Sequence, residues 1–416
     1  MLDKGTPTRR RSRTTLVVLM LVVLAPGAWA QIEYETLHKF HLRGYGGNEP
    51  RSALTFDQTG NLYGTTIGGG VNGGGTVFKL TPNKDGSWSE SVLYSFCGLA
   101  YCADGWLPFA GLVFDHAGSL YGTTLAGGTL GSASGYGTVF KLTPNKDGTW
   151  SESVLYSFCD CGDGSAPYAG VIFDQAGNLY GTTAGGGFSD FGATVFKLEP
   201  NRDGSWGESV LYTFCSLSNC RDGSQPEAGL TFDRAGNLYG TTEFGGPYGA
   251  GVVFKLTQNP DGRWKEEVVF PSFGSASGLI FDQAGDLYGA AGYPGIVFEL
   301  MPTAYGRWKE KVLHRFTGGK DGGLPMGVIL DSAGNVYGTA FFGGSPICKP
   351  YGCGVVFKLA PNSKGEWKET VLHDFFDDPG SNPAAALIFD AAGNLYGTTY
   401  GNTSGPNVGS VFEITP

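Results

Sequence analysis

The chain has 416 residues, with 28 Lys and Arg against 38 Asp and Glu, which gives a formal net charge of −10. Nucleic acids and anionic membranes both attract basic surfaces, so this charge argues against either as a partner. We therefore expect no nucleic-acid binding.

Residues 1–30 have the three parts of a cleaved signal peptide. Four arginines between residues 9 and 13 precede an apolar run at 16–24, and Ala28-Trp29-Ala30 forms the cleavage motif. An uncleaved anchor is the alternative, but the run is shorter than the roughly 20 residues of a membrane span. Residues 1–30 contain five basic residues and one acidic residue, so cleavage leaves 23 against 37 and a net charge of −14. We expect a secreted monomer, extracellular or periplasmic, without membrane insertion after cleavage.

The remaining chain, residues 31–416, contains seven copies of a phrase such as "FDQAGNLYGTT" at 173–183. Each repeat has four short runs rich in Val, Ile, Phe, Tyr and Thr, separated by Gly, Pro, Asn and Asp, which is typical of strands and turns. Four-stranded units that stack radially form a β-propeller. The repeats are marked by one aspartate each: Asp57, Asp115, Asp174, Asp233, Asp282, Asp331 and Asp390.

The termini predict that the propeller is a closed ring of seven blades. Residues 34–40 ("YETLHKF") match the fourth strand of a repeat, such as 368–375 ("KETVLHDF"), whereas the chain ends on a third strand, "SVFEITP" at 410–416. The N-terminal strand would therefore complete the last blade and remove the exposed edges of an open array. The fold class is all-β, with residues 31–416 as one propeller domain.

The phrase itself predicts a turn. Asp174 would cap the turn through its carboxylate, Gly177 would take a positive φ, and Asn178 would lead into the second strand. A calcium or catalytic role for the seven aspartates is the alternative. A Gly or Ala at the start of each first strand, such as Gly170, predicts that this strand is innermost, where strands crowd around the axis.

The pattern "FDxxGNLYGTT…GTVFKL" resembles the tandem GloVer repeat of exported bacterial proteins, known as the choice-of-anchor family. The resemblance covers residues 34–416. That family is described by its repeat and by varied C-terminal anchors, so the resemblance implies export and a repeat fold but no activity. The sequence ends at Pro416, directly after the last predicted strand, so it departs from that pattern and we expect no anchor. The turn also resembles that of NHL-type propellers.

Loop lengths divide the predicted ring into two faces. The turns between strands one and two, and between strands three and four, keep constant lengths, and we call their side the invariant face. The other two connections vary in length from repeat to repeat and form the variable face. Binding loops differ on a constant scaffold, so we expect ligands at the variable face.

Eight cysteines lie in the variable loops as four local pairs, which predicts disulfides in an exported protein. Each bridge would close a very short loop, so we expect all four to pin loops and none to hold the fold together. A metal site is the alternative, although no histidine accompanies a pair. The bridge across a single residue, Asp160, is the one that spacing supports least. The pairs are Cys97/Cys102, Cys159/Cys161, Cys215/Cys220 and Cys348/Cys353.

Aromatic residues and "DG" aspartates also gather in the variable loops, which suits glycans or peptides. The fifth repeat has the shortest connections on this face, so its neighbours should stand higher and leave a notch in the rim. We expect an extended ligand to lie there, with these contacts: Tyr293 at the base, Asp321 beside it, and Phe341, Phe342, Phe244 and Tyr248 on the flanks.

No catalytic motif is present, and the first strands are almost entirely apolar, so the sequence indicates no general base at the axis. We expect no cofactor and no metal. A binding module for a glycan, peptide or protein is the favoured function. Two alternatives stay open: a carbohydrate-active or lyase-type enzyme that uses loop carboxylates, and a structural component of the cell surface.

Overall fold

The fold is described from a computed structural model for residues 32–42, 46–129, 135–187, 192–271, 274, 277–348, 350–376, 380–401 and 407–416. Residues 32–416 form one compact unit, and the expected signal peptide lies outside the described residues. Among the described residues, no helix has the length and apolar character needed to cross a membrane.

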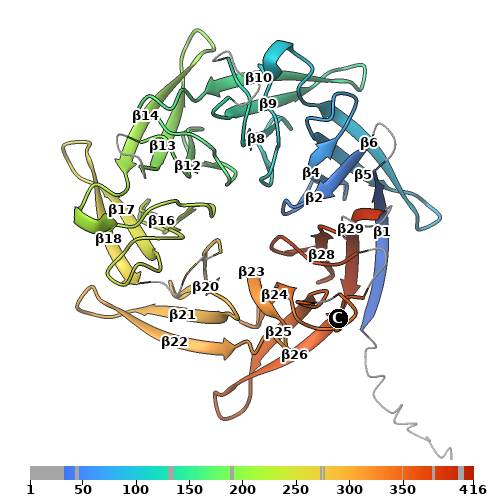
Figure 1. Cartoon of the computed structure of the whole chain (residues 1–416), viewed down its shortest axis with the longest axis vertical. Coiled ribbons are helices and arrows are strands. Elements are labelled where there is room, and N and C mark those ends of the chain that lie inside the picture. The colour runs from blue at the N-terminus through green and yellow to red at the C-terminus, as the bar shows by residue number, and fades with distance from the viewer. Residues whose placement is uncertain are drawn as a thin grey trace, which may run out of the picture. The chain divides into compact units, whose positions relative to one another are not determined.

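The unit is a seven-bladed propeller of antiparallel sheets, as the repeats predict (Figure 1). Blades 1 to 3 are built from β2 (Gly47–Pro50), β3 (Thr55–Phe56), β4 (Leu62–Gly69), β5 (Thr76–Pro82) and β6 (Trp88–Ser95); β7 (Val113–Phe114), β8 (Leu120–Thr124), β9 (Thr138–Pro144) and β10 (Trp150–Ser157); and β11 (Ile172–Phe173), β12 (Leu179–Thr183), β13 (Thr194–Pro200) and β14 (Trp206–Thr213). Two 3-10 turns, η1 (Ala100–Cys102) and η2 (Ser218–Cys220), lie in loops between blades.

The other four blades follow the same order from the axis outward. They are built from β15 (Thr231–Phe232), β16 (Leu238–Thr241), β17 (Val252–Gln258) and β18 (Trp264–Pro271); β19 (Ile280–Phe281), β20 (Leu287–Ala291), β21 (Ile296–Pro302) and β22 (Trp308–Arg315); β23 (Gly323–Leu330), β24 (Val336–Phe342), β25 (Val355–Pro361) and β26 (Trp367–Asp374); and β27 (Ile388–Phe389), β28 (Leu395–Thr399), β29 (Asn407–Thr415) and β1 (Glu33–His41).

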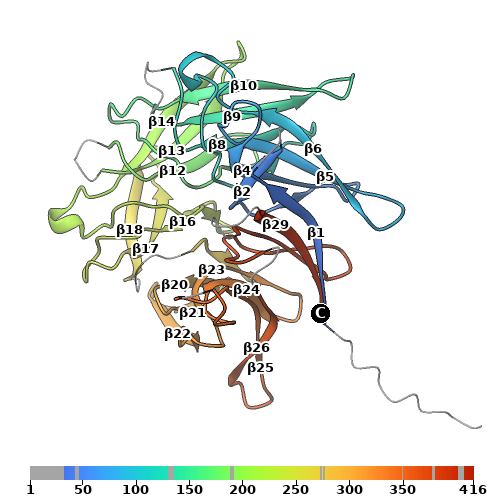
Figure 2. The ribbon, with the colours of Figure 1, turned by 45° about the vertical axis from the view of Figure 1, so that its right-hand side comes forward.

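Ring closure by the N-terminal strand is confirmed. β1 runs antiparallel to β29, from the pair Glu33–Thr415 onward, and Figure 2 shows the two strands side by side. A second link closes the ring near the axis, where the Thr398 hydroxyl of blade 7 donates a hydrogen bond to the Ser52 carbonyl of blade 1 at 3.0 Å. The first and last blades are therefore joined both at the outer edge and near the centre.

The hydrophobic core is divided into seven clusters, and each lies between two consecutive blades. Between blades 1 and 2, for example, Tyr63, Val77 and Phe96 pack against Leu120 and Phe140. A four-stranded sheet cannot bury both of its faces by itself, so each blade depends on its two neighbours.

The glycine of "LYGTT" is required by this packing. A Cβ atom on Gly181 of β12 would lie 2.5 Å from Cζ of Phe196 on β13. Phe196 in turn packs edge-on against Phe158 of the preceding blade, with ring centroids 5.1 Å apart. The missing side chain thus makes room for an aromatic pair that joins two blades.

The predicted aspartate turn is confirmed. The Asp174 carboxylate accepts hydrogen bonds from the backbone N–H groups of Ala176 and Asn178 and from the Tyr180 hydroxyl, and Gly177 has φ 86°. Partial burial acts to raise the pKa of Asp174, but these hydrogen bonds outweigh it and hold the pKa below its usual value. The carboxylate is therefore a structural acceptor.

The junction between blades 5 and 6 differs from the others. At the remaining six junctions a strand-two threonine donates to a carbonyl of the next blade, as Thr123 does to Ala169 at 2.9 Å. Blade 5 has Ala290 at that position and cannot donate. Its neighbour instead extends its first strand, β23, to eight residues, all of them beside β24.

We predict that removal of residues 31–42 opens the ring. Leu37 and Phe40 of β1 are buried, and losing two such side chains costs roughly 3–6 kcal/mol at about 1.5–3 kcal/mol each. The deletion also exposes the edge of β29, so we expect a large fall in Tm together with aggregation in size-exclusion chromatography. Lys39→Ala, at an exposed position of β1, is the control and should melt normally. A monomeric deletion variant with an unchanged Tm would contradict closure by β1.

Candidate functional site

The variable loops contain all four predicted disulfides, and the predicted pairing is confirmed. The bridges of blades 1 to 3 occupy equivalent places, because the first cysteine follows the phenylalanine after strand four and the second stands two residues before a "DG" aspartate. In the second repeat the intervening loop is shorter, and Cys159 bridges directly to Cys161. The cysteines therefore close the loop that contains the aspartate.

The fourth bridge differs from the other three in the burial of one of its cysteines. Cys353 is completely buried and packs with Tyr337 and Phe375 in the core cluster between blades 6 and 7. Its carbonyl also accepts a hydrogen bond from the N–H group of Asn382 in blade 7, at 2.7 Å. The spacing to Cys348 could not show this, because burial of Cys353 depends on side chains of the next blade. The Cys348–Cys353 bridge thus fastens its loop to the core of the ring.

Three of the "DG" aspartates, Asp104, Asp163 and Asp222, are buried within the variable loops, and Asp321 is partly exposed. Asp104 is fully buried and accepts hydrogen bonds from the Tyr94 hydroxyl and from the N–H groups of Gly98 and Leu99. Asp321 accepts from the N–H group of Thr317 at 2.7 Å and lies 3.6 Å from Nε2 of His314. These carboxylates stabilise the conformations of the loops. The Asp321 carboxylate, which we expected to contact a ligand, accepts hydrogen bonds within its own loop instead.

The predicted rim residues fall into two groups. Tyr293 is 60% exposed and packs edge-on against Phe342 at 6.0 Å, and Phe342 also contacts Phe341 and Tyr351. Phe244 and Tyr248 are exposed on the loop of blade 4, and within the described part of the chain no ring contact joins them to Tyr293. The structure therefore brings together the blade 5 and blade 6 members of the predicted notch.

A turn that sequence reasoning missed leads into the first strand of six blades. In each, the residue before a proline has a positive φ of 54–60°, although it is not glycine. Such backbone conformations are costly and persist where the surroundings enforce them. We call these the pre-proline turns, and their positive-φ residues are Glu49, Leu107, Ala166, Gln225, Leu324 and Asn382.

Backbone hydrogen bonds hold the pre-proline turns from both sides. In blade 2 the Leu107 N–H donates to the Gly74 carbonyl of blade 1, and the Leu107 carbonyl accepts from Leu125 of its own blade. Ala166 makes the equivalent pair of bonds with Tyr136 and Ala184. Asn382 follows the same pattern, with bonds to Cys353 of blade 6 and Tyr400 of blade 7, so these three turns are each fixed to two blades.

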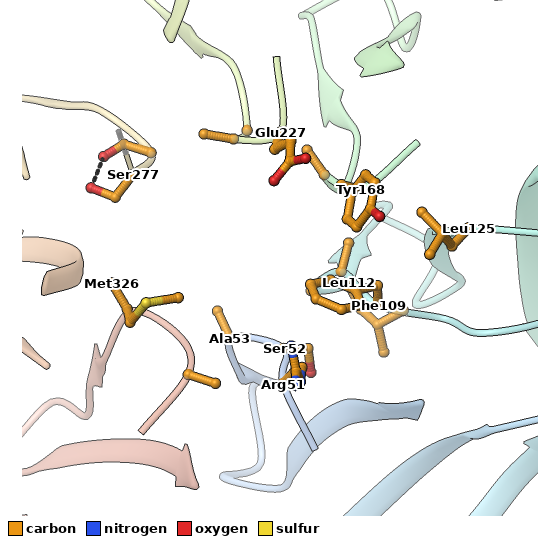
Figure 3. A pocket seen from close by; sticks show the side chains of 18 of the residues that line it. Arg51, Ser52, Ala53, Phe109, Leu112, Leu125, Tyr168, Glu227, Ser277 and Met326 are labelled. Carbon is orange, nitrogen blue, oxygen red and sulfur yellow. Dashed lines mark hydrogen bonds between the residues drawn. The ribbon is translucent and has the colours of Figure 1, made fainter. Parts of the chain in front are cut away.

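The residue after each turn proline lines a cavity at the axis, on the variable face. This axial cavity has a volume of about 850 Å³ and an apolar floor that includes Leu112 and Val171. Figure 3 shows several of the lining side chains around it. The six side chains that the turns supply are chemically different: Arg51, Phe109, Tyr168, Glu227, Met326 and Ala384.

An arc of stacked side chains forms one wall of the axial cavity. The Arg51 guanidinium lies 3.9 Å from the ring centroid of Tyr400 and 5.5 Å from that of Phe109. Phe109 packs edge-on against Tyr168 at 5.4 Å, and Figure 3 shows Tyr168 beside Glu227. Aromatic faces and a cation are therefore presented together at the mouth.

Two carboxyl groups follow the arc. Glu227 follows the turn proline of blade 4, and Glu243 follows β16 of the same blade, near enough for its charge to act on Glu227. Burial, together with the negative charge of Glu243, raises the pKa of Glu227 to about 7. Glu227 therefore keeps its proton to a higher pH than an isolated glutamate does.

The glycines in the cavity wall differ in how closely neighbouring atoms approach them. A Cβ atom on Gly170 would lie 2.7 Å from the Gly111 carbonyl oxygen, which confirms that small residues are needed where blades 2 and 3 crowd together. A Cβ atom on Gly229 or Gly278 would meet nothing within 4 Å. The free space in the cavity therefore adjoins Glu227.

The axial cavity contains none of the six predicted ligand residues in its lining, but it lies next to the predicted notch. Leu324 and Pro325 line the cavity, and the preceding Gly323 would carry a Cβ 3.6 Å from the Tyr293 ring. The sequence did contain a signal for the cavity. One position, directly after the repeated proline and before a small residue, changes from repeat to repeat. It is Arg51, Phe109, Tyr168 and Glu227 in the first four repeats.

One group in the described part of the chain has the spacing of a metal site, namely Cys159, Cys161 and Asp163, whose ligand atoms lie within 4.8 Å of one another. Both sulfurs are in a disulfide and Asp163 accepts from the Tyr156 hydroxyl, so these residues do not offer thiolate ligands. This residue set does not fit a metal ion.

Comparison with known proteins identifies the repeat family but indicates no activity. The profile of the Gloeobacter/Verrucomicrobia repeat matches residues 28–231, 129–345 and 289–416. No curated protein matches significantly. A catalytically inactive virginiamycin B lyase from Staphylococcus aureus with quinupristin is 14% identical, with a TM-score of 0.56, over 93% of this chain and 100% of that one. The WD40 propeller domain of Doa1 is 11% identical, with a TM-score of 0.51, over 91% and 96%. At these identities the likeness concerns the fold alone.

We predict that reduction of the disulfides loosens the variable loops and leaves the blades folded. A bridge that closes such a short loop contributes on the order of 2 kcal/mol, too little to control the stability of the ring. Cys353 should stay in the core as a thiol, because a free cysteine packs like a small apolar side chain. Hydrogen exchange after treatment with a reductant should accelerate at residues 97–106 and 215–224. Exchange in β5 and β13 should not change, and global unfolding on reduction would contradict this division.

We also predict that stability falls as the pH rises from about 5 to about 7. Four glutamates in the fourth strands have their pKa raised to about 7. Burial is the main cause, and the charge of a "DG" aspartate on the preceding blade is the second. These residues are Glu152, Glu208, Glu266 and Glu369. The folded state thus binds protons more tightly than the unfolded state, so the stabilisation is complete below the unfolded pKa of 4.5 and is lost as the pH approaches 7.

Thermal melts at several pH values test this effect. Replacing all four glutamates with glutamine should flatten the dependence of Tm on pH between 5 and 7. A wild-type Tm that rises over this range would show that the four carboxyl groups do not control it.

Proposed function

The chain belongs to the Gloeobacter/Verrucomicrobia repeat family, whose profile matches it from residue 28 to 416, and we propose that it is a binding module whose ligand enters the axial cavity from the variable face. One observation carries the proposal. Six strained turns direct six different side chains into one cavity, and backbone hydrogen bonds fix the turns at Leu107, Ala166 and Asn382 to two blades each. Repeated strain of this kind persists where it serves a site.

The cavity has the composition of a ligand site. It is concave and mainly apolar, with a few polar groups, and its aromatic residues Phe109 and Tyr168 are only half-buried. A sugar ring or an aromatic side chain of a peptide can lie on such faces, while Arg51 and Glu227 supply the charged contacts. A glycan or a peptide segment is therefore the ligand class that we propose.

The rim at blade 5 offers a path for a longer ligand. Only residues 292–295 join β20 to β21, whereas residues 343–354 join β24 to β25 in the next blade. Tyr293 and Phe342 meet beside this short loop, next to cavity residues Leu324 and Pro325. We propose that an extended ligand leaves the cavity across these two rings.

The geometry supports binding over glycoside hydrolysis. Two catalytic carboxyl groups of a glycosidase stand about 5 to 10 Å apart, so that a sugar carbon fits between them. Glu227 is the one acidic residue among the described residues that line the axial cavity. The cavity lining therefore does not present the two separated carboxyl groups that this reaction uses.

We predict that Phe109→Ala and Tyr293→Ala each weaken ligand binding by about 1–3 kcal/mol without changing the fold. Residues 31–416 should first be screened against glycan and peptide arrays, and the affinity of a hit should then be compared among variants by calorimetry. Tyr305→Ala is the matched control, because Tyr305 is 92% exposed on the invariant face. An affinity unchanged by Phe109→Ala would place the ligand outside the axial cavity.

Trp150→Ala provides the complementary comparison. Trp150 packs edge-on against Tyr63 of the neighbouring blade, near the invariant face. Its loss should lower Tm and leave the affinity of the folded protein unchanged.

A further inference from the structure

Arg51 is the one basic residue among the described residues that line the axial cavity. The equivalent position after the turn proline is Phe109 in blade 2, Tyr168 in blade 3 and Glu227 in blade 4. The chain as a whole is acidic, with 38 Asp and Glu against 28 Lys and Arg. A single cation therefore distinguishes blade 1 from the rest of the cavity wall.

Aromatic rings pack against the Arg51 side chain where a carboxylate would be the usual partner. Its guanidinium lies 3.9 Å from the ring centroid of Tyr400 on blade 7 and 5.5 Å from that of Phe109 on blade 2. Within the described part of the chain, Arg51 takes part in no ion pair and no side-chain hydrogen bond. Its Nε is buried without an acceptor, which costs stability. The protein thus holds a guanidinium at the cavity without neutralising its charge.

This packing leaves the outer nitrogens of Arg51 available to a ligand. A guanidinium whose flat faces lie on aromatic rings keeps its N–H donors in the plane, where a carboxylate can accept two parallel hydrogen bonds. Nε is the one nitrogen of Arg51 that is buried without a partner, so the two Nη nitrogens remain accessible at the cavity. A guanidinium is also weakly hydrated, so little is lost when a ligand displaces its water. The chemistry of Arg51 therefore favours a ligand carboxylate.

The rest of the lining suits an apolar side chain better than a sugar. Leu112 and Val171 form the floor, and Figure 3 shows Met326 across the cavity. A sugar carries a hydroxyl on most of its carbons, and each hydroxyl needs a hydrogen-bond partner when it leaves water. The lining offers few such partners, and the Ser52 hydroxyl is already bonded to the backbone of Thr65. A carboxylate beside an apolar side chain is what the C-terminus of a peptide presents.

Neither the charge of the chain nor Glu227 opposes an anion at Arg51 strongly. Charges farther away than about 8 Å are largely screened at physiological salt, so direct contact with the guanidinium outweighs the net charge of −10. Along the wall, Phe109 and Tyr168 stand between Arg51 and Glu227 (Figure 3). A carboxylate on Arg51 is therefore kept apart from the acid of blade 4.

The position of Arg51 also gives a bound peptide a direction. Arg51 belongs to blade 1, and the short loop of blade 5 with Tyr293 lies across the axis from that blade (Figure 1). A peptide whose last residue lies at Arg51 crosses the cavity before its preceding residues reach the Tyr293 and Phe342 rings. The chain end is thus the part of the ligand that reaches the far wall.

We propose that the axial cavity binds the C-terminus of a peptide, with the carboxylate on the Arg51 guanidinium and an apolar last side chain on the floor at Leu112 and Val171. This inference rests on the proposed function, because it names the ligand class of the same cavity. Tyr400 and Phe109 are positioning residues that fix the plane of the guanidinium. Internal peptide segments, which have an amide in place of the carboxylate, bind more weakly.

Three small probes test the ligand class. N-acetyl-phenylalanine carries the carboxylate, its carboxamide is the neutral counterpart of nearly the same shape, and D-glucuronate carries a carboxylate on a sugar ring. Each should be titrated into residues 31–416 by calorimetry at pH 7. Hydrogen bonds to charged groups are stronger than neutral ones, so we expect the acid to bind at least about tenfold more tightly than the amide. D-Glucuronate should bind more weakly than the acid, because it has no apolar side chain.

Two variants assign the effect to Arg51. Arg51→Gln should reduce the affinity for the acid to that for the amide, while the affinity for the amide stays the same. Arg51→Lys keeps the charge without the planar fork, so it should retain part of the preference for the acid. Arg263→Gln is the control, because it removes one positive charge from a side chain that is 86% exposed on the invariant face. Circular dichroism and Tm should show that all three variants fold.

The outcomes separate this inference from the proposed function. Equal affinities for the acid and the amide, or an acid affinity that ignores Arg51→Gln, would overturn the carboxylate site. If Phe109→Ala nevertheless weakened both probes, the axial cavity would stand as the ligand site. Tighter binding of D-glucuronate than of the acid would assign the carboxylate to a glycan and overturn the peptide class. Absence of binding by all three probes at millimolar concentration would also overturn that class, and an array ligand indifferent to Phe109→Ala would overturn the cavity itself.

Discussion

The structure depends on the burial of each blade face against the next blade. No cluster of buried side chains belongs to one blade alone among the described residues, and the aromatic pairs such as Phe158 with Phe196 cross the boundary between two blades. Because a sheet of this size has two apolar faces and no covering helix, the chain becomes stable only as a ring. Closure by β1 is part of the same requirement, since it covers the edge of β29.

A core placed between blades leaves the axis free. The first strands are only two residues long in six blades and meet through small residues or through threonine-to-carbonyl hydrogen bonds. Space therefore remains inside the ring, and it opens on the side where the loops vary. Except at the junction of blades 5 and 6, the hydrogen bonds that join the blades also fix a carbonyl at or beside the cavity wall, as Thr123 does for Ala169 beside Tyr168. Stability of the ring and shape of the cavity thus depend on the same contacts.

Acidic residues have three different roles here, and their surroundings decide which. Asp174 and its equivalents are hydrogen-bond acceptors in turns, because N–H groups surround them. Asp104 anchors a loop and stands near Glu152, whose pKa burial and the Asp104 charge raise to about 7. Glu227 lines the axial cavity, where burial and the charge of Glu243 raise its pKa to about 7. An acidic composition therefore says little about function until the partner of each carboxyl group is known.

The sequence by itself determined the number of blades, their four-stranded form, the closing strand, the turn aspartates and the disulfide pairs. All of these follow from local or periodic signals, because a turn, a strand or a short bridge is specified by residues close together in the chain. The axial cavity was decided by the tertiary structure. Its lining residues are separated by roughly 50 to 60 positions, as Phe109 is from Arg51 and from Tyr168, and they meet only when the ring closes. Loop length identified the variable face, but not which loop side chains turn inward. The burial of Cys353 also depends on the tertiary structure, because a neighbouring blade covers it. The same is true of the "DG" carboxylates, whose direction is set by the surrounding hydroxyl and N–H groups.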